Sequence, residues 1–191
     1  MLMDAARLTR SLAHYSSFAR TRRIPLLSDR LKQPMTDDET FLAEFEGCRW
    51  PLSRWHHRDH IKLAYLYLCR YSFGEALSRI RDGIKAHNAA HQLPDSSTSG
   101  FHETMTHAWL CLVQFAIAEY GPSANADDFY ENHPELSQQK TLRFFYSKER
   151  FMSPEAKTRF CEPDLTPFPI GRGCKGKDSQ TETPAGGSGE T

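Results

Sequence analysis

Three histidines fall within five positions of one stretch, RWHHRDHIKLAYLYL, which spans residues 54–68. His57 and His60 are three residues apart and precede Ile61 on an apolar stripe at helical spacing. A helix through this stretch therefore points both imidazoles inward. His56 lies about 100° away from that face and is expected to meet solvent.

A fourth histidine with a carboxylate beside it begins a later helix. His102 precedes Met105 and Trp109 at helical spacing, and Glu103 follows it directly. Neutral imidazole is the commonest metal ligand in proteins, and three histidines leave an open coordination position on a catalytic ion. We therefore predict that His57, His60 and His102 bind a divalent metal ion (zinc, iron or manganese).

Glu103 is the candidate for the general base on metal-bound water, or for a fourth ligand. Two-iron helical bundles need Glu-x-x-His pairs, and the sequence holds none. A mononuclear site is therefore preferred. The metal-dependent bundles of the DinB-like kind are similar in the style of this site, because they carry three histidines across bundle helices. The chain departs from them at His102 and His107, which are five apart where that family has an HxxxH pair.

Two other interpretations stay open. Behind metal binding stand a metal-free pocket for acid–base chemistry or ligand binding, and purely structural histidines that hold helix ends together. His87 and His91 are read as structural, because an exposed helix C-terminus stabilises an imidazolium without further chemistry. His107 is read as an ordinary, partly buried histidine.

The elements that must position these residues are helices, because no alternating strand pattern occurs. Ser72 with Glu75 and Thr36 with Glu39 have the spacing of capping boxes, and Gly121 stands where a helix would end. The expected helices cover residues 37–48, 55–71, a segment opening at 72, and 101–120, followed by shorter ones at 126–131 and 136–146. We predict an all-α, up-down helical bundle of four main helices plus shorter C-terminal helices.

An alternating order would bring the histidines together. If the second helix runs up, the third down and the fourth up, the start of the second and the start of the fourth meet at one end of the bundle. The end of the third helix meets them there, so six of the nine histidines would converge: His56, His57, His60, His87, His91 and His102. Five aromatic residues suit the wall of a small-molecule pocket beside them, although core packing would explain most of these equally well: Trp50, Trp55, Tyr65, Tyr67 and Trp109.

The ends of the chain differ from its middle. Residues 1–34 are rich in arginine, serine and alanine, which predicts either a disordered extension or a targeting segment. A start at Met35 is the competing interpretation. Residues 171–191 are rich in glycine, serine and threonine and are predicted to be a disordered tail. The helical domain is expected at 35–170.

Composition narrows the class of protein. Lys plus Arg and Asp plus Glu both number 24, so no net charge favours nucleic acid or a membrane as partner. Five widely spaced cysteines without a CxxC motif argue against a disulfide framework. We expect a cytoplasmic protein, or a mitochondrial one if residues 1–34 are a targeting segment.

Taken together, the residues predict a metal-binding helical protein that acts on a small organic molecule, with a metal-free binding or interaction module as the alternative. One further segment, TLRFFYSKERF, mixes aromatic residues with Arg143, Lys148 and Arg150. Its spacing favours a packed amphipathic helix with a solvated basic face over an RNA-binding surface. The sequence does not assign the substrate, the reaction or the oligomeric state.

Overall fold

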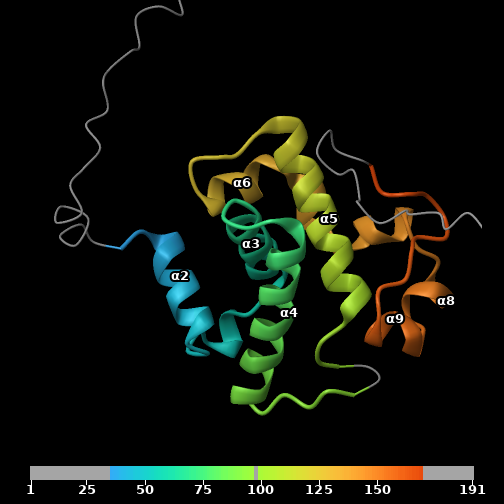
Figure 1. Ribbon diagram of the computed structural model, residues 1–191, viewed down its shortest axis with the longest axis horizontal. Helices are drawn as coiled ribbons and strands as arrows, with labels where there is room; N and C mark the ends of the chain where they lie inside the picture. Colours follow the sequence, from blue (N-terminus) through green and yellow to red (C-terminus); the bar gives the residue numbers. More distant parts are fainter. Residues whose placement is uncertain (1–34, 97–98, 170–191) are drawn as a thin grey trace, which may run out of the picture. The chain divides into compact units, whose positions relative to one another are not determined.

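The computed structural model describes residues 35–96 and 99–169, and in these two ranges it contains helices and no strand (Figure 1). The predicted N-terminal extension at 1–34 and the predicted tail at 171–191 lie outside the described residues. The all-α class is confirmed for the described part of the chain.

Two of the four main helices begin, and one ends, where the capping residues predict. Thr36 and Glu39 form a reciprocal capping box, and the Ser72 side chain accepts from the Glu75 backbone. Gly121, with φ of 84°, ends the last main helix in a conformation that favours glycine. These helices are α2 (Asp37–Glu46), α3 (His57–Leu68), α4 (Phe73–Ala90) and α5 (Glu103–Tyr120).

Two helix starts differ from the prediction in a way that concerns the histidines. The helix expected from residue 55 begins at His57, and His56 is its N-cap in an extended conformation, with its backbone N–H donating to Asp59. The helix expected from residue 101 begins at Glu103, and His102 is its N-cap. Periodicity placed both residues inside helices because it does not register where the backbone leaves helical geometry.

The single helix predicted at 136–146 is wrong. Gln138 is extended (φ −95°, ψ 106°) and separates a short α-helix from a 3₁₀ segment. The short elements are η2 (Leu52–Arg54), α6 (Ala126–Asn132), α7 (Pro134–Ser137), η3 (Gln139–Phe144), α8 (Lys148–Phe151) and α9 (Pro154–Thr158).

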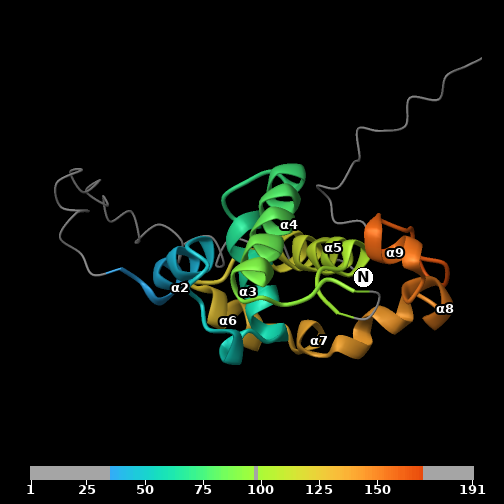
Figure 2. The same ribbon diagram turned by 90° about the horizontal axis from the view of Figure 1, so that it is seen from below.

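Helices α3, α4 and α5 pack against one another, and α2 packs on α4. The core between them is apolar and well covered, with fully buried side chains from α2, α3 and α5 such as Phe45, Ile61, Leu110 and Val113. Figure 2 shows α8 and α9 beside the beginning of α5, where Thr104 donates a hydrogen bond to the Arg159 carbonyl. The C-terminal segments therefore cover the start of α5.

No helix of the described residues is long and apolar enough to cross a membrane. The four cysteines in these residues, Cys48, Cys69, Cys111 and Cys161, are not joined in disulfides.

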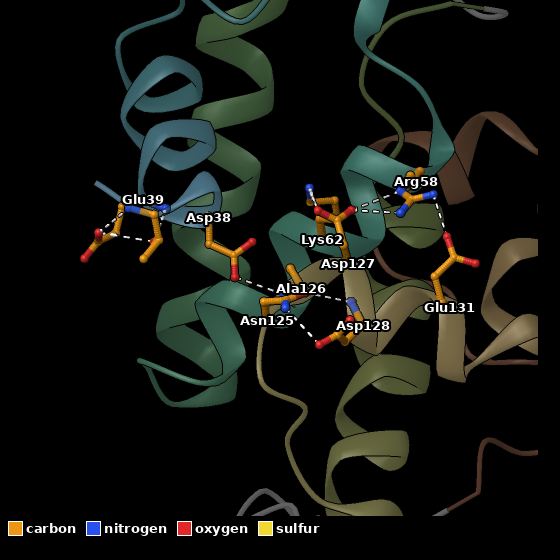
Figure 3. Close-up of polar contacts among 10 residues, drawn as sticks. Asp38, Glu39, Arg58, Lys62, Asn125, Ala126, Asp127, Asp128 and Glu131 are labelled. Atoms are coloured by element: carbon orange, nitrogen blue, oxygen red, sulfur yellow. Dashed lines mark hydrogen bonds and ion pairs between the residues drawn. The ribbon is translucent and has the colours of Figure 1, made fainter. Parts of the chain in front are cut away.

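A salt-bridge network ties α6 to α3. Asp127 accepts from Arg58 at 2.9 Å and from Lys62 at 2.8 Å, and Glu131 pairs with Arg58 at 2.8 Å (Figure 3). The Lys62 side chain is only 11% exposed, whereas the Arg58 side chain is 41% exposed. Lys62 therefore depends on Asp127 more than Arg58 does.

Replacing Asp127 by alanine is expected to lower the free energy of unfolding by about 1–2 kcal/mol, because the nearly buried Lys62 ammonium then lacks its carboxylate. This is below the loss typical of a fully buried pair, since Asp127 itself is partly exposed to water. Glu131→Ala, which removes a contact to Arg58 alone, is the control and should cost less than about 0.5 kcal/mol. Urea unfolding at neutral pH measures both, and equal losses would contradict the asymmetry.

Candidate functional site

The three predicted ligands, His57, His60 and His102, line one pocket of about 1780 Å³. Its walls come from the start of α3, the start of α5, η3 and α8, with Trp55 and Trp109 among the lining side chains. Of the six histidines expected to converge, four line this pocket, with His56 as the fourth, whereas His87 and His91 do not. Their proposed role as metal ligands depends on what their ring nitrogens contact.

His57 is the first residue of α3, and its Nε2 donates to the Leu136 carbonyl at 2.8 Å. Its ring packs on Trp109, with centroids 4.6 Å apart. Burial lowers the pKa of His57, although the hydrogen bond to Leu136 opposes this shift. The neutral ring with its proton on Nε2 therefore fits this position, which leaves the Nδ1 lone pair for another contact.

His60 lies one turn further along α3, with its ring tilted against Trp55 at 4.3 Å between centroids. Burial, with smaller contributions from His57 and His87, lowers the pKa of His60 to about 4. His60 is therefore uncharged near neutral pH, and in that form it can accept one hydrogen bond and donate another.

His102 uses both ring nitrogens within the protein. Its Nδ1 accepts from the Met105 backbone N–H at 3.2 Å, which caps α5, and its Nε2 donates to the Phe151 carbonyl at 3.2 Å. The ring also stacks on Phe151. Burial lowers the pKa of His102. This histidine fastens α8 to the start of α5, so a metal ion on either nitrogen would have to displace one of these hydrogen bonds.

Glu103 does not share the pocket with the histidines. Its carboxylate accepts two hydrogen bonds from the Arg81 guanidinium on α4, at 2.5 and 2.8 Å, and Glu103 is buried. The hydrogen bond from Arg81 lowers the pKa of Glu103. A base or ligand role for Glu103 stays a prediction, and it would require this ion pair to open.

Within residues 35–96 and 99–169, no three His, Cys, Asp or Glu side chains are grouped so that they could hold a metal ion. The predicted histidines share a pocket without forming a compact cluster. His56, which we expected to face away from the site, is exposed to solvent but also lines the pocket. The helix start at His57 explains this, because an N-cap residue lies off the helical wheel.

His87 has a structural role in the core of the domain and not at an exposed helix end. His87 is completely buried, where an exposed helix end was expected, and its Nε2 donates to the Trp50 carbonyl at 2.8 Å. Its ring lies among those of Phe45, Trp55 and His91. His107 is partly buried, as predicted, and stacks on Phe160 outside the pocket.

The outer wall of the pocket was not predicted from the sequence. Lys140, Arg143 and Lys148 line it from η3 and α8, together with Met152. The segment TLRFFYSKERF was interpreted as one packed helix with a solvated basic face. Its mixture of aromatic and basic residues was the sequence signal for a binding surface. The division of the segment between η3 and α8, which places the basic side chains at the pocket, could not be predicted from helical periodicity.

No protein-family model, no curated protein and no solved structure matches this chain. The similarity to DinB-like bundles therefore rests on the histidine pattern alone.

Proposed function

We propose that the pocket lined by His57, His60 and His102 binds a small organic molecule, and that it does so without a resident metal ion. The observation that carries the proposal is the meeting of four imidazoles, that of His56 included, and two tryptophans, Trp55 and Trp109, around one pocket of about 1780 Å³. Apolar walls with a few polar groups are typical of ligand sites. An alternating up-down order of the main helices would account for this convergence.

The ring nitrogens favour the metal-free form of the prediction. Both ring nitrogens of His102 already form hydrogen bonds: Nδ1 accepts from the Met105 N–H and Nε2 donates to the Phe151 carbonyl. Nε2 of His57 likewise donates to the Leu136 carbonyl. A three-histidine metal site would have to give up the helix cap or the contact to α8. His60, which keeps a neutral ring at the pocket wall, is better suited to hydrogen-bond a polar group of the ligand.

A neutral aromatic dye tests the pocket directly. N-phenylnaphthylamine fluoresces when it enters an apolar site, and Trp55 and Trp109 are placed to transfer energy to it. We expect one dye per chain. Thr106→Trp, which adds a large side chain at the pocket wall, should weaken dye binding at least about tenfold, since it removes apolar contact area worth more than about 1.4 kcal/mol.

Ala118→Trp is the matched control, because Ala118 is exposed on the same helix and does not line the pocket. It should leave the dye affinity unchanged. Equal weakening by both substitutions, or no saturable binding to the unmodified chain, would contradict the proposal. Circular dichroism confirms that both variants stay helical.

The metal-dependent alternative is decided by metal analysis of protein purified without a polyhistidine tag and supplied with zinc, iron or manganese. We expect no stoichiometric metal. His60→Phe keeps the ring against Trp55 and removes both nitrogens, and His107→Phe is the control outside the pocket. Stoichiometric metal that is lost in His60→Phe and kept in His107→Phe would favour the metal-binding prediction instead.

A further inference from the structure

The outer wall of the pocket carries positive charge without partners. Lys140, Arg143 and Lys148 are exposed and line the pocket, and no hydrogen bond or ion pair joins their side chains to another residue in the described ranges. Many basic side chains elsewhere in these ranges pair with carboxylates, as Arg81 does with Glu103 and Lys157 with Asp95, although the exposed Arg70 does not. What sets this wall apart is that three unpaired cations line one pocket, where they would favour an anionic ligand.

The only carboxylate among the described lining residues is Glu149, which is exposed on α8. Its single negative charge leaves the wall with an excess of positive charge. The imidazoles on the inner side add none near neutral pH, because burial lowers the pKa of His57, His60 and His102. The charge is therefore concentrated at the outer wall and is absent from the inner one.

Exposed apolar side chains gather at the same place. Six large hydrophobic residues are exposed in the described ranges, and three of them line the pocket: Met105, Met152 and Leu165. Met152 and Leu165 are 59% and 58% exposed. Leaving such side chains in water is unfavourable, and their concentration at one pocket marks a binding surface. Methionine adapts its shape to a ligand more readily than other apolar residues.

The size of the pocket restricts the ligand further. About 1780 Å³ exceeds the roughly 300–1,000 Å³ that is usual for a drug-sized molecule. An elongated ligand can run from the basic outer wall toward Trp109 and the neutral histidines. A compact polar metabolite would leave the apolar side chains uncovered.

We propose that the pocket takes an elongated amphiphile with an anionic head, of the long-chain fatty acid or alkyl phosphate kind. The head lies at Lys140, Arg143 and Lys148, and the apolar chain covers Met105 and Met152. Three cations against Glu149 leave this wall with a net charge of +2, which a carboxylate or a phosphate head would partly or fully neutralise. The proposal rests on the proposed function, since it names the class of molecule that the same pocket binds.

Displacement of bound N-phenylnaphthylamine tests the class. Oleate is kept below the concentration at which it forms micelles. Its dissociation constant from dye displacement is expected to be at least about tenfold lower than that of oleyl alcohol, because three cations face its head. Acetate, which has the charge without the chain, should not displace it. The proposal is overturned if neither oleate nor hexadecyl phosphate displaces the dye at a lower concentration than oleyl alcohol does. Whichever of the two binds more tightly identifies the head as a carboxylate or a phosphate.

Variants of the outer wall provide a second test of the proposal. Arg143→Gln combined with Lys148→Gln should weaken oleate about tenfold, at up to about fivefold for each exposed cation, and leave the affinity for the neutral dye unchanged. Arg70→Gln removes an exposed arginine outside the pocket and is the matched control. An unchanged oleate affinity in the double variant would overturn the inference.

The two proposals fail in different ways. If the dye binds one to a chain but neither oleate nor hexadecyl phosphate gains affinity from its charge, the pocket is a ligand site and only the anionic head is wrong. If the dye does not bind, equilibrium dialysis with oleate itself decides, and absence of saturable oleate binding overturns both proposals.

Discussion

Acidification from pH 7 to pH 4 is expected to remove about 5 kcal/mol from the free energy of unfolding. Burial lowers the pKa of His60 and of His107 to about 4. In the unfolded chain both would titrate near 6.5. Between these two pKa values the unfolded chain binds protons that the folded chain does not bind. The free energy of unfolding therefore falls as the pH falls from about 6.5 to about 4.

The size of the effect follows from the size of the shift. One pKa unit is worth about 1.4 kcal/mol, so each histidine contributes up to about 3 kcal/mol, and solvent screening at the partly buried His107 reduces the sum. Domains are commonly stable by only about 5–15 kcal/mol. The protein is therefore expected to be marginal or unfolded at pH 4.

Urea unfolding at several pH values between 7 and 4 measures this loss. His60→Phe and His107→Phe keep an aromatic ring at each position and remove the titrating group, so each should flatten the dependence on pH. His56→Phe, at an exposed N-cap, should leave it as it is. Equal stability at pH 7 and pH 4 would contradict the prediction, and so would an unchanged pH dependence in both His60→Phe and His107→Phe.

Features of the fold that depend on neighbours in sequence were predictable. Thr36 with Glu39, Ser72 with Glu75, and Gly121 act within a few residues of themselves, and each stands at the helix end that its spacing indicated. The inward stripe of α3 also follows from local periodicity. It led to the pocket because short connections make consecutive helices neighbours.

Partners far apart in sequence were not predictable. His102 and Phe151 are 49 residues apart, and Arg81 and Glu103 are 22 apart on different helices. Periodicity predicts which face of a helix turns inward, but it does not predict which side chain of another helix contacts that face. Glu103 was therefore assigned to the site on position alone, although its carboxylate meets an arginine on α4.

Glu103→Gln should settle what this carboxylate does, with an expected loss of about 2–3 kcal/mol in the free energy of unfolding at neutral pH. The change breaks a bidentate, charge-assisted pair in which Glu103 is buried and the Arg81 side chain is 31% exposed. It also removes a negative charge from the first turn of α5, where the helix dipole favours one. Dye binding in the pocket should stay unchanged.

Replacing both partners, as Arg81→Met with Glu103→Leu, is expected to recover most of that loss, because no unpaired charge is then left behind. If Glu103 served the pocket as a base or ligand, Glu103→Gln would instead weaken ligand or metal binding while stability stayed within about 0.5 kcal/mol. The hydrogen bond from Arg81 lowers the pKa of Glu103, whereas a general base works best with a pKa near the working pH. The pair with Arg81 therefore makes Glu103 a weak base, and the same ion pair stabilises the packing of α4 on α5.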